Sequence, residues 1–99
     1  MQALEWVPGE PVEIRVRRRG AWTEMDDAGE AIRRAGRPPG WHEVADRIAA
    51  AEGMNVQRST GRVFVAYGVR SGHDDAEIER RLAETVLRVY HGVLDLEDD

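Results

Sequence analysis

The residues best suited to chemistry form one short run near the N-terminus. Four arginines, Arg15, Arg17, Arg18 and Arg19, precede a tryptophan, Trp22. Guanidinium groups bind phosphates through their N–H donors, and an indole ring can stack against a nucleobase. The same residues on a solvated strand, with a cation resting over the ring, would need no ligand. The run therefore predicts either a nucleic-acid contact or a charged surface strand.

The register of the strands around this run decides between the two outcomes. Apolar and charged side chains alternate over residues 12–17, which predicts a half-buried strand, and residues 21–25 can return as its antiparallel partner. A two-residue turn places Arg17 opposite Trp22 on the exposed side. A three-residue turn shifts the second strand by one residue and places Trp22 opposite Val16, on the buried side.

Histidines and acids give no stronger candidate for catalysis or metal binding. His42, Glu43 and Asp46 match half of a His-Glu-x-x-His zinc motif, but Asp46 stands where the second histidine is required. His73 fits the entry to a helix, and His91 fits a helix end. No glycine-rich phosphate loop with its lysine is present in the sequence. We therefore expect a non-catalytic protein with no metal and no cofactor.

Composition limits the remaining possibilities. The 99 residues include no cysteine, and 41% are hydrophobic and 33% charged, which suits one folded domain in a reducing compartment. All 14 basic residues are arginine, a skew that a GC-rich bacterial genome would produce. No signal-peptide pattern or membrane-length apolar run is visible, so we expect a soluble, cytoplasmic protein. The net charge of −5 disfavours broad nucleic-acid binding but allows a local basic surface.

Two helices and a second hairpin account for the middle of the chain. Residues 26–35 fit a short helix capped by aspartates and ended by a glycine, and residues 41–52 carry one apolar stripe at helical spacing. Residues 55–58 and 62–69 flank a Ser-Thr-Gly turn and predict a hairpin. Its later strand is apolar on both faces, so we expect it to be covered on both sides or to lie at a subunit contact.

The longest amphipathic pattern lies near the C-terminal end. Asp74 can cap a helix whose apolar residues recur at helical spacing, with Gly92 marking its expected end. One stripe of these side chains is enough for the core. Leu87, Tyr90 and Leu94 widen the apolar arc to roughly 180°, beyond the roughly 100° that a surface helix buries. The sequence therefore predicts that this flank meets a protein partner, most simply a second copy of the chain.

Together these patterns predict an α+β fold. A small, mainly antiparallel sheet made of two hairpins should pack against two or three helices, including the long C-terminal amphipathic helix. One domain is expected over residues 1–94, followed by a frayed acidic tail at residues 95–99. The favoured function is a non-catalytic protein-interaction or accessory domain that self-associates as a homo-oligomer through the C-terminal helix. The alternative is a nucleic-acid-binding module that uses the arginine run and Trp22, and no membrane contact is expected.

Overall fold

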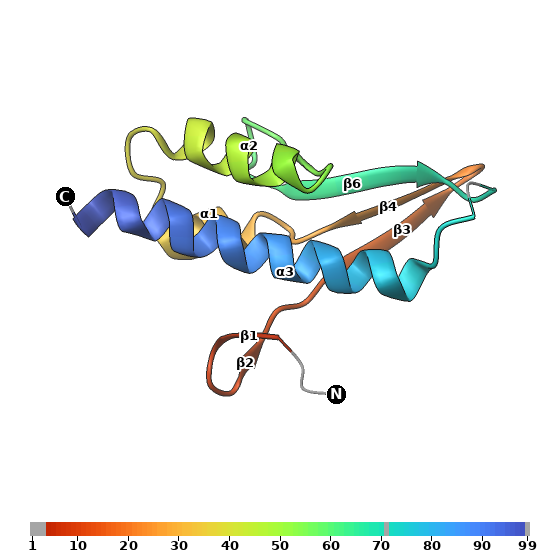
Figure 1. Cartoon of the computed structure of the whole chain (residues 1–99), viewed down its shortest axis with the longest axis horizontal. Helices are drawn as coiled ribbons and strands as arrows, with labels where there is room; N and C mark the ends of the chain where they lie inside the picture. Colours follow the sequence, from red (N-terminus) through yellow and green to blue (C-terminus); the bar gives the residue numbers. More distant parts are fainter. Residues whose placement is uncertain (1–3, 71, 99) are drawn as a thin grey trace.

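The computed structural model describes residues 4–70 and 72–98 and confirms the α+β fold (Figure 1). In chain order its elements are β1 (Glu5–Val7), β2 (Glu10–Pro11), β3 (Arg15–Arg19), β4 (Trp22–Asp26), α1 (Glu30–Ala35), α2 (Trp41–Ala51), β5 (Asn55–Val56), β6 (Val63–Gly68), α3 (Asp75–Leu94) and the 3₁₀ turn η1 (Asp95–Asp98). β1 and β2 form a separate hairpin, and the other four strands form one antiparallel sheet in the order β3-β4-β6-β5. None of the described helices is long and apolar enough to cross a lipid bilayer.

The sheet has helices on one face only. Thr23 and Met25 of β4 and Val63 and Tyr67 of β6 are buried. Met25, Val63 and Tyr67 share one core cluster with side chains of α2 and α3, which lie on this side of the sheet (Figure 1). Side chains alternate between the two faces of a strand, so their neighbours point away from the helices. Ala66 is one of these neighbours and is exposed. The expectation that β6 is covered on both sides is therefore wrong for the described chain, and a subunit contact on that face stays a prediction.

The core lies where α3 packs against α1, α2 and the sheet. Apolar side chains of α3, including Leu82, Val86, Val89 and Val93, are fully buried. Gly92 allows α3 to approach α2 closely, because a Cβ atom at this position would lie 2.5 Å from the Ile48 side chain. Gly92 is thus a packing residue within the helix, and the expectation that it ends the helix is wrong.

The short helix that Asp26 and Asp27 were expected to cap, ending at Ala35, begins later than its sequence suggests. Ala28 and Gly29 both have positive φ angles, so the backbone cannot be helical until Glu30. The Asp27 carboxylate still satisfies the first turn by accepting the N–H groups of Gly29 and Ala31. Gly36 ends the helix in the left-handed conformation, as its sequence position predicts.

The two ends of the chain differ from the expected picture. The β1–β2 hairpin was not predicted, and its Trp6 is buried with its ring edge-on to Tyr90 at 5.4 Å between centroids. At the other end, α3 runs directly into the η1 turn, so the segment expected as a frayed tail has helical structure from Asp95 to Asp98. Asp99 lies outside the described residues.

Candidate functional site

The arginine run lies in the hairpin formed by β3 and β4, in a register that neither predicted turn gives. Arg19 pairs with Trp22 and Arg17 with Glu24, so Gly20 and Ala21 form the two-residue loop. Gly20 has a φ of 57° at the first loop position, where a type II′ hairpin turn calls for glycine. Both predicted registers are therefore wrong, but the two-residue alternative is off by two residues, so Trp22 keeps the exposed side that this alternative predicted. The hairpin itself is confirmed.

The register separates the arginines between the two faces of the sheet. Arg15, Arg17 and Arg19 alternate along β3 and share the face that carries Trp22, which is 59% exposed. We call this the open face. Arg18 points to the helix side instead, so the run does not act as one continuous cluster.

Arg18 links the β3–β4 hairpin to the start of α3 through hydrogen bonds. Its guanidinium donates to the Asp75 carboxylate at 2.6 Å and to the Thr23 hydroxyl at 3.1 Å. The Tyr67 hydroxyl donates to the same carboxylate at 2.5 Å. Burial, together with the bond to Asp75, raises the pKa of Tyr67 to about 12, and the two donors lower the pKa of Asp75. We assign Arg18 to this anchor and not to the open face.

Two arginines on the open face, Arg15 and Arg62, are held by the buried Asp26 and the half-buried Glu24. Arg15 donates through Nε to Asp26 at 2.8 Å, and Arg62 donates through Nη1 to Asp26 at 2.9 Å and pairs with Glu24 at 2.6 Å. Burial alone would raise the pKa of Asp26. The bonds from Arg15, the Ala28 N–H and Arg62 outweigh burial and hold that pKa below its ordinary value. The network fixes both guanidinium groups in place.

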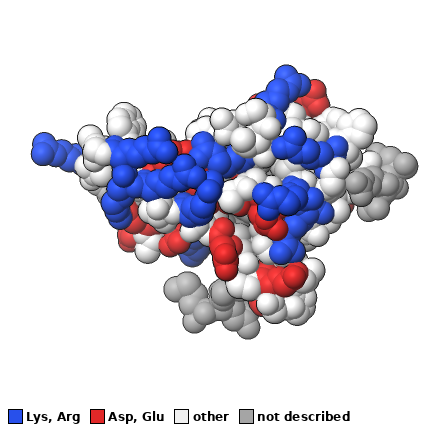
Figure 2. All heavy atoms as spheres, turned by 180° about the vertical axis from the view of Figure 1, so that it is seen from behind, with Lys and Arg blue, Asp and Glu red and all other residues white. Residues whose placement is uncertain are grey.

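Arg17 and Arg19 have no such partners. Among the described residues, no carboxylate lies within ion-pair distance of either side chain. Arginine side chains form a band across the molecule when it is viewed from behind, with acidic side chains between and below them (Figure 2). A hollow of about 340 Å³ on this surface is lined by Arg15, Arg17, Arg19, Glu24, Gln57, Thr60 and Arg62.

The β5–β6 loop brings residues to the open face that the sequence did not single out. Thr60 donates its hydroxyl to the Gln57 side-chain oxygen at 2.9 Å and accepts the Arg62 backbone N–H at 3.2 Å. The Arg62 guanidinium lies 4.8 Å from the centre of the Phe64 ring. Thr60 and Arg62 lie far from the arginine run in the sequence. No sequence pattern indicates that the two regions meet. Only the pairing of β4 with β6 brings them together.

The C-terminal helix flank has partners within the chain. Leu87, Tyr90 and Leu94 are half-buried and pack against the core. Tyr90 meets Trp6 of the N-terminal hairpin, which the sequence analysis missed. The apolar area on which the self-association prediction rests is thus largely packed against other parts of the same chain. Association through this flank stays a prediction.

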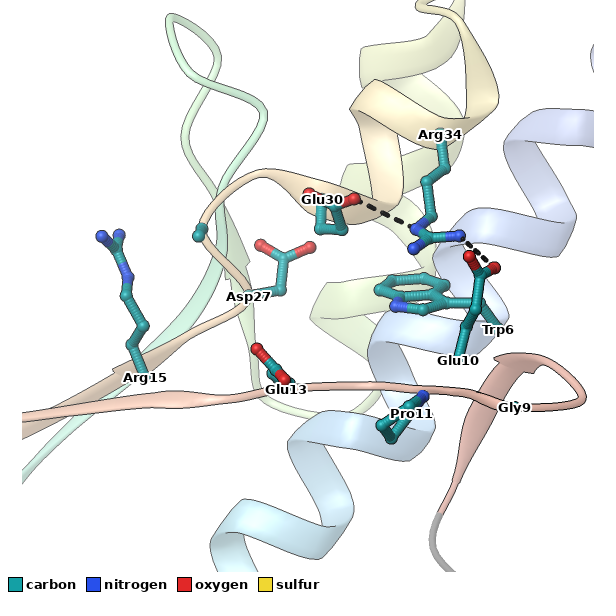
Figure 3. A pocket seen from close by; sticks show the side chains of 10 residues that line it. Trp6, Gly9, Glu10, Pro11, Glu13, Arg15, Asp27, Glu30 and Arg34 are labelled. Atoms are coloured by element: carbon teal, nitrogen blue, oxygen red, sulfur yellow. Dashed lines mark hydrogen bonds and ion pairs between the residues drawn. The ribbon is translucent and has the colours of Figure 1, made fainter.

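A hollow of about 470 Å³ lies between the N-terminal hairpin and α1 (Figure 3). Arg34 lies over the Trp6 ring at 5.1 Å and bonds Glu10 and Glu30, each at 3.1 Å. Burial raises the pKa of Asp27, whose carboxylate accepts backbone N–H groups and so is not free for a ligand. These polar groups join the hairpin to the helix and satisfy one another.

The histidines do not come together. His42 packs edge-on to Trp41, His73 edge-on to Tyr67, and His91 beside Tyr90. Within the described ranges, no three His, Asp or Glu side chains form a group that could hold a metal ion.

Comparisons of the chain with protein-family models, curated proteins and solved structures gave no match.

Proposed function

We propose that the protein is a non-catalytic binding module that holds nucleic acid on the open face of its sheet. The observation that carries this proposal is the placement of Trp22, 59% exposed, opposite Arg19 and on the same face as Arg17. Neither arginine has an ion pair among the residues that the structure describes. An indole offers a flat apolar surface for a base, and the guanidinium groups offer donors to the adjoining phosphates.

The local charge supports the proposal although the whole chain is acidic. Four arginines line the hollow on the open face, and two of them, Arg15 and Arg62, pair with the two acids Glu24 and Asp26. Two positive charges thus remain in excess on a chain whose net charge is −5. Each phosphate neutralised on a single strand contributes about −0.7 to the slope of log K against log salt. With two to four arginines engaged, we expect a modest slope of about −1.4 to −2.8.

The arginines of β3 have an explanation that requires no ligand, but Trp22 does not. β3 is an edge strand of the sheet, and charged side chains on an edge strand discourage pairing with another chain. This explanation does not extend to Trp22, because an exposed indole beside an open edge promotes association and does not prevent it. The tryptophan is therefore the residue that favours a ligand.

Fluorescence anisotropy with a labelled oligothymidylate tests the proposal. Binding should weaken between about 25 and 200 mM salt, and the double variant Arg17→Ala/Arg19→Ala should lose about tenfold or more in affinity. Arg47→Ala/Arg81→Ala is the matched control, since it removes the same charge from exposed positions on α2 and α3. Equal losses in the two double variants, or no binding by the native chain at the lowest salt, would contradict the proposal.

A further inference from the structure

The stacking surface at Trp22 has room for an unpaired base. Trp22 pairs across the sheet with Gly68, and the next position of β6 on this face is Ala66, so no large side chain stands beside the indole there. A hollow of about 320 Å³ adjoins the ring and is lined by Ala21, Trp22, Gly68, Val69 and Arg70. Away from the ends of a duplex, the base faces are covered by neighbouring base pairs, so along a nucleic-acid chain a ring of this kind stacks on unpaired bases.

The width of the sheet also disfavours insertion of the open face into the major groove of a duplex. A free two-stranded ribbon fits the major groove, which is about 12 Å wide. Here β6 accompanies β4 as far as the hairpin loop, with Trp22 opposite Gly68, so the sheet is three strands wide at its tip. Three backbones span about 10 Å before side chains are added, and the arginines of β3 increase that width. The open face is therefore a poor fit to the groove, whereas it can lie along a single nucleic-acid strand.

A second contact lies at the other end of the same face. Arg62 precedes β6, while Gly68 ends it beside Trp22, so the two contacts are separated by about 20 Å along the strand. Between them, Arg15, Arg17 and Arg19 form a row with about 6.8 Å between successive members. Single-strand sites of about 4 to 16 nucleotides are long enough to cover this distance.

The donors at this second contact are held in position before any ligand binds. Glu24 and Asp26 hold the Arg62 guanidinium through Nη1, and its Nε atom is buried, so among the described residues Nη2 is the atom of this side chain left for a phosphate. The loop that carries Thr60 is pressed against Gly29, where a Cβ atom would lie 2.8 Å from the Thr60 carbonyl oxygen. A guanidinium held in place by ion pairs lowers the entropy cost of binding a phosphate.

Resting on the proposed function, we infer that the ligand is a single strand that stacks a base on Trp22, follows β3 and places a phosphate in the hollow formed by Gln57, Thr60 and Arg62. The chemistry recognised is an unpaired base on a phosphodiester backbone, which single-stranded DNA and RNA share. The assignment adds the β5–β6 loop to the site. It also excludes a duplex as the preferred partner.

The test compares three probes of equal length: an oligothymidylate, an oligouridylate and a blunt DNA duplex. Either or both single strands should bind about tenfold or more tightly than the duplex at the same salt, and only the single strands should quench Trp22. Gln57→Glu places a negative charge in the hollow and should weaken single-strand binding about tenfold. Ala50→Glu is the control with the same net charge, at an exposed position of α2.

The outcomes separate this inference from the function on which it rests. Duplex binding as tight as single-strand binding overturns the inference while the nucleic-acid function stands. The same holds if Gln57→Glu loses no more affinity than Ala50→Glu, provided that thermal melts show both variants folded. Failure of all three probes to bind the native chain at low salt overturns both.

Discussion

Replacing Asp26 with asparagine tests whether the acid network beneath the open face is held by charge. The Asp26 side chain is fully buried and accepts bonds from Arg15, Arg62 and the Ala28 N–H. Asparagine keeps the shape but loses the charge and turns N–H donors toward a guanidinium. Hydrogen bonds to charged groups contribute about 1.5–3 kcal/mol each, so losing most of two should cost about 2–4 kcal/mol at neutral pH. Each kcal/mol lowers Tm by about 4–8 °C in a domain of this size.

The pH dependence of the stability difference between the native chain and Asp26→Asn shows whether the charge of Asp26 causes it. Because the fold lowers the pKa of Asp26, its contribution to stability is present above its ordinary pKa of 3.8 and is lost as pH falls through the lower folded value. The difference between the native chain and Asp26→Asn should therefore shrink in urea unfolding as the pH is lowered from neutrality into the range below 3.8. Asp46→Asn, at an exposed position of α2, should change stability little at either pH. A deficit that persists unchanged in acid, or no deficit at pH 7, would refute the reasoning.

Three further predictions concern the rest of the fold. Gly29→Ala should cost about 2–4 kcal/mol, because φ is positive and the new Cβ meets backbone; an unchanged urea midpoint would contradict this. The raised pKa of Tyr67, about 12, implies stability that is complete below pH 10 and lost as pH rises toward 12; alkaline unfolding should show a shallower loss in Asp75→Asn. Leu87→Ala should lower stability by about 1–3 kcal/mol at every protein concentration, whereas a concentration-dependent Tm would favour the self-association prediction.

The sequence predicts the elements with regular periodicity and misses those that depend on distant contacts. α2 and α3 have apolar residues at helical spacing, and their positions are confirmed to within a few residues. The hairpin register was not predictable, because Gly20 fits several turns and a shift of one residue turns Trp22 to the other face. Pairing with β6 and the bond from Arg18 to Asp75, 57 residues away, accompany the register that the fold adopts.

The flank of α3 shows the same limit. Its wide apolar arc indicates a second partner, and one such partner is Trp6 of the β1–β2 hairpin, whose strands have only three and two residues. Elements this short carry too little pattern for a sequence to reveal them. The arginines of β3 were visible as a run, whereas Gln57, Thr60 and Arg62 join them only through sheet pairing.

The central claim is that the open face, and not the C-terminal helix, contacts a ligand. Titration of the isotope-labelled protein with an oligothymidylate, followed by NMR, tests this claim directly. We predict the largest shifts at the Trp22 indole N–H and the Arg17 and Arg19 side chains, with Leu87 and Leu94 of α3 little changed. Shifts centred on α3, or no shifts at low salt, would contradict the account.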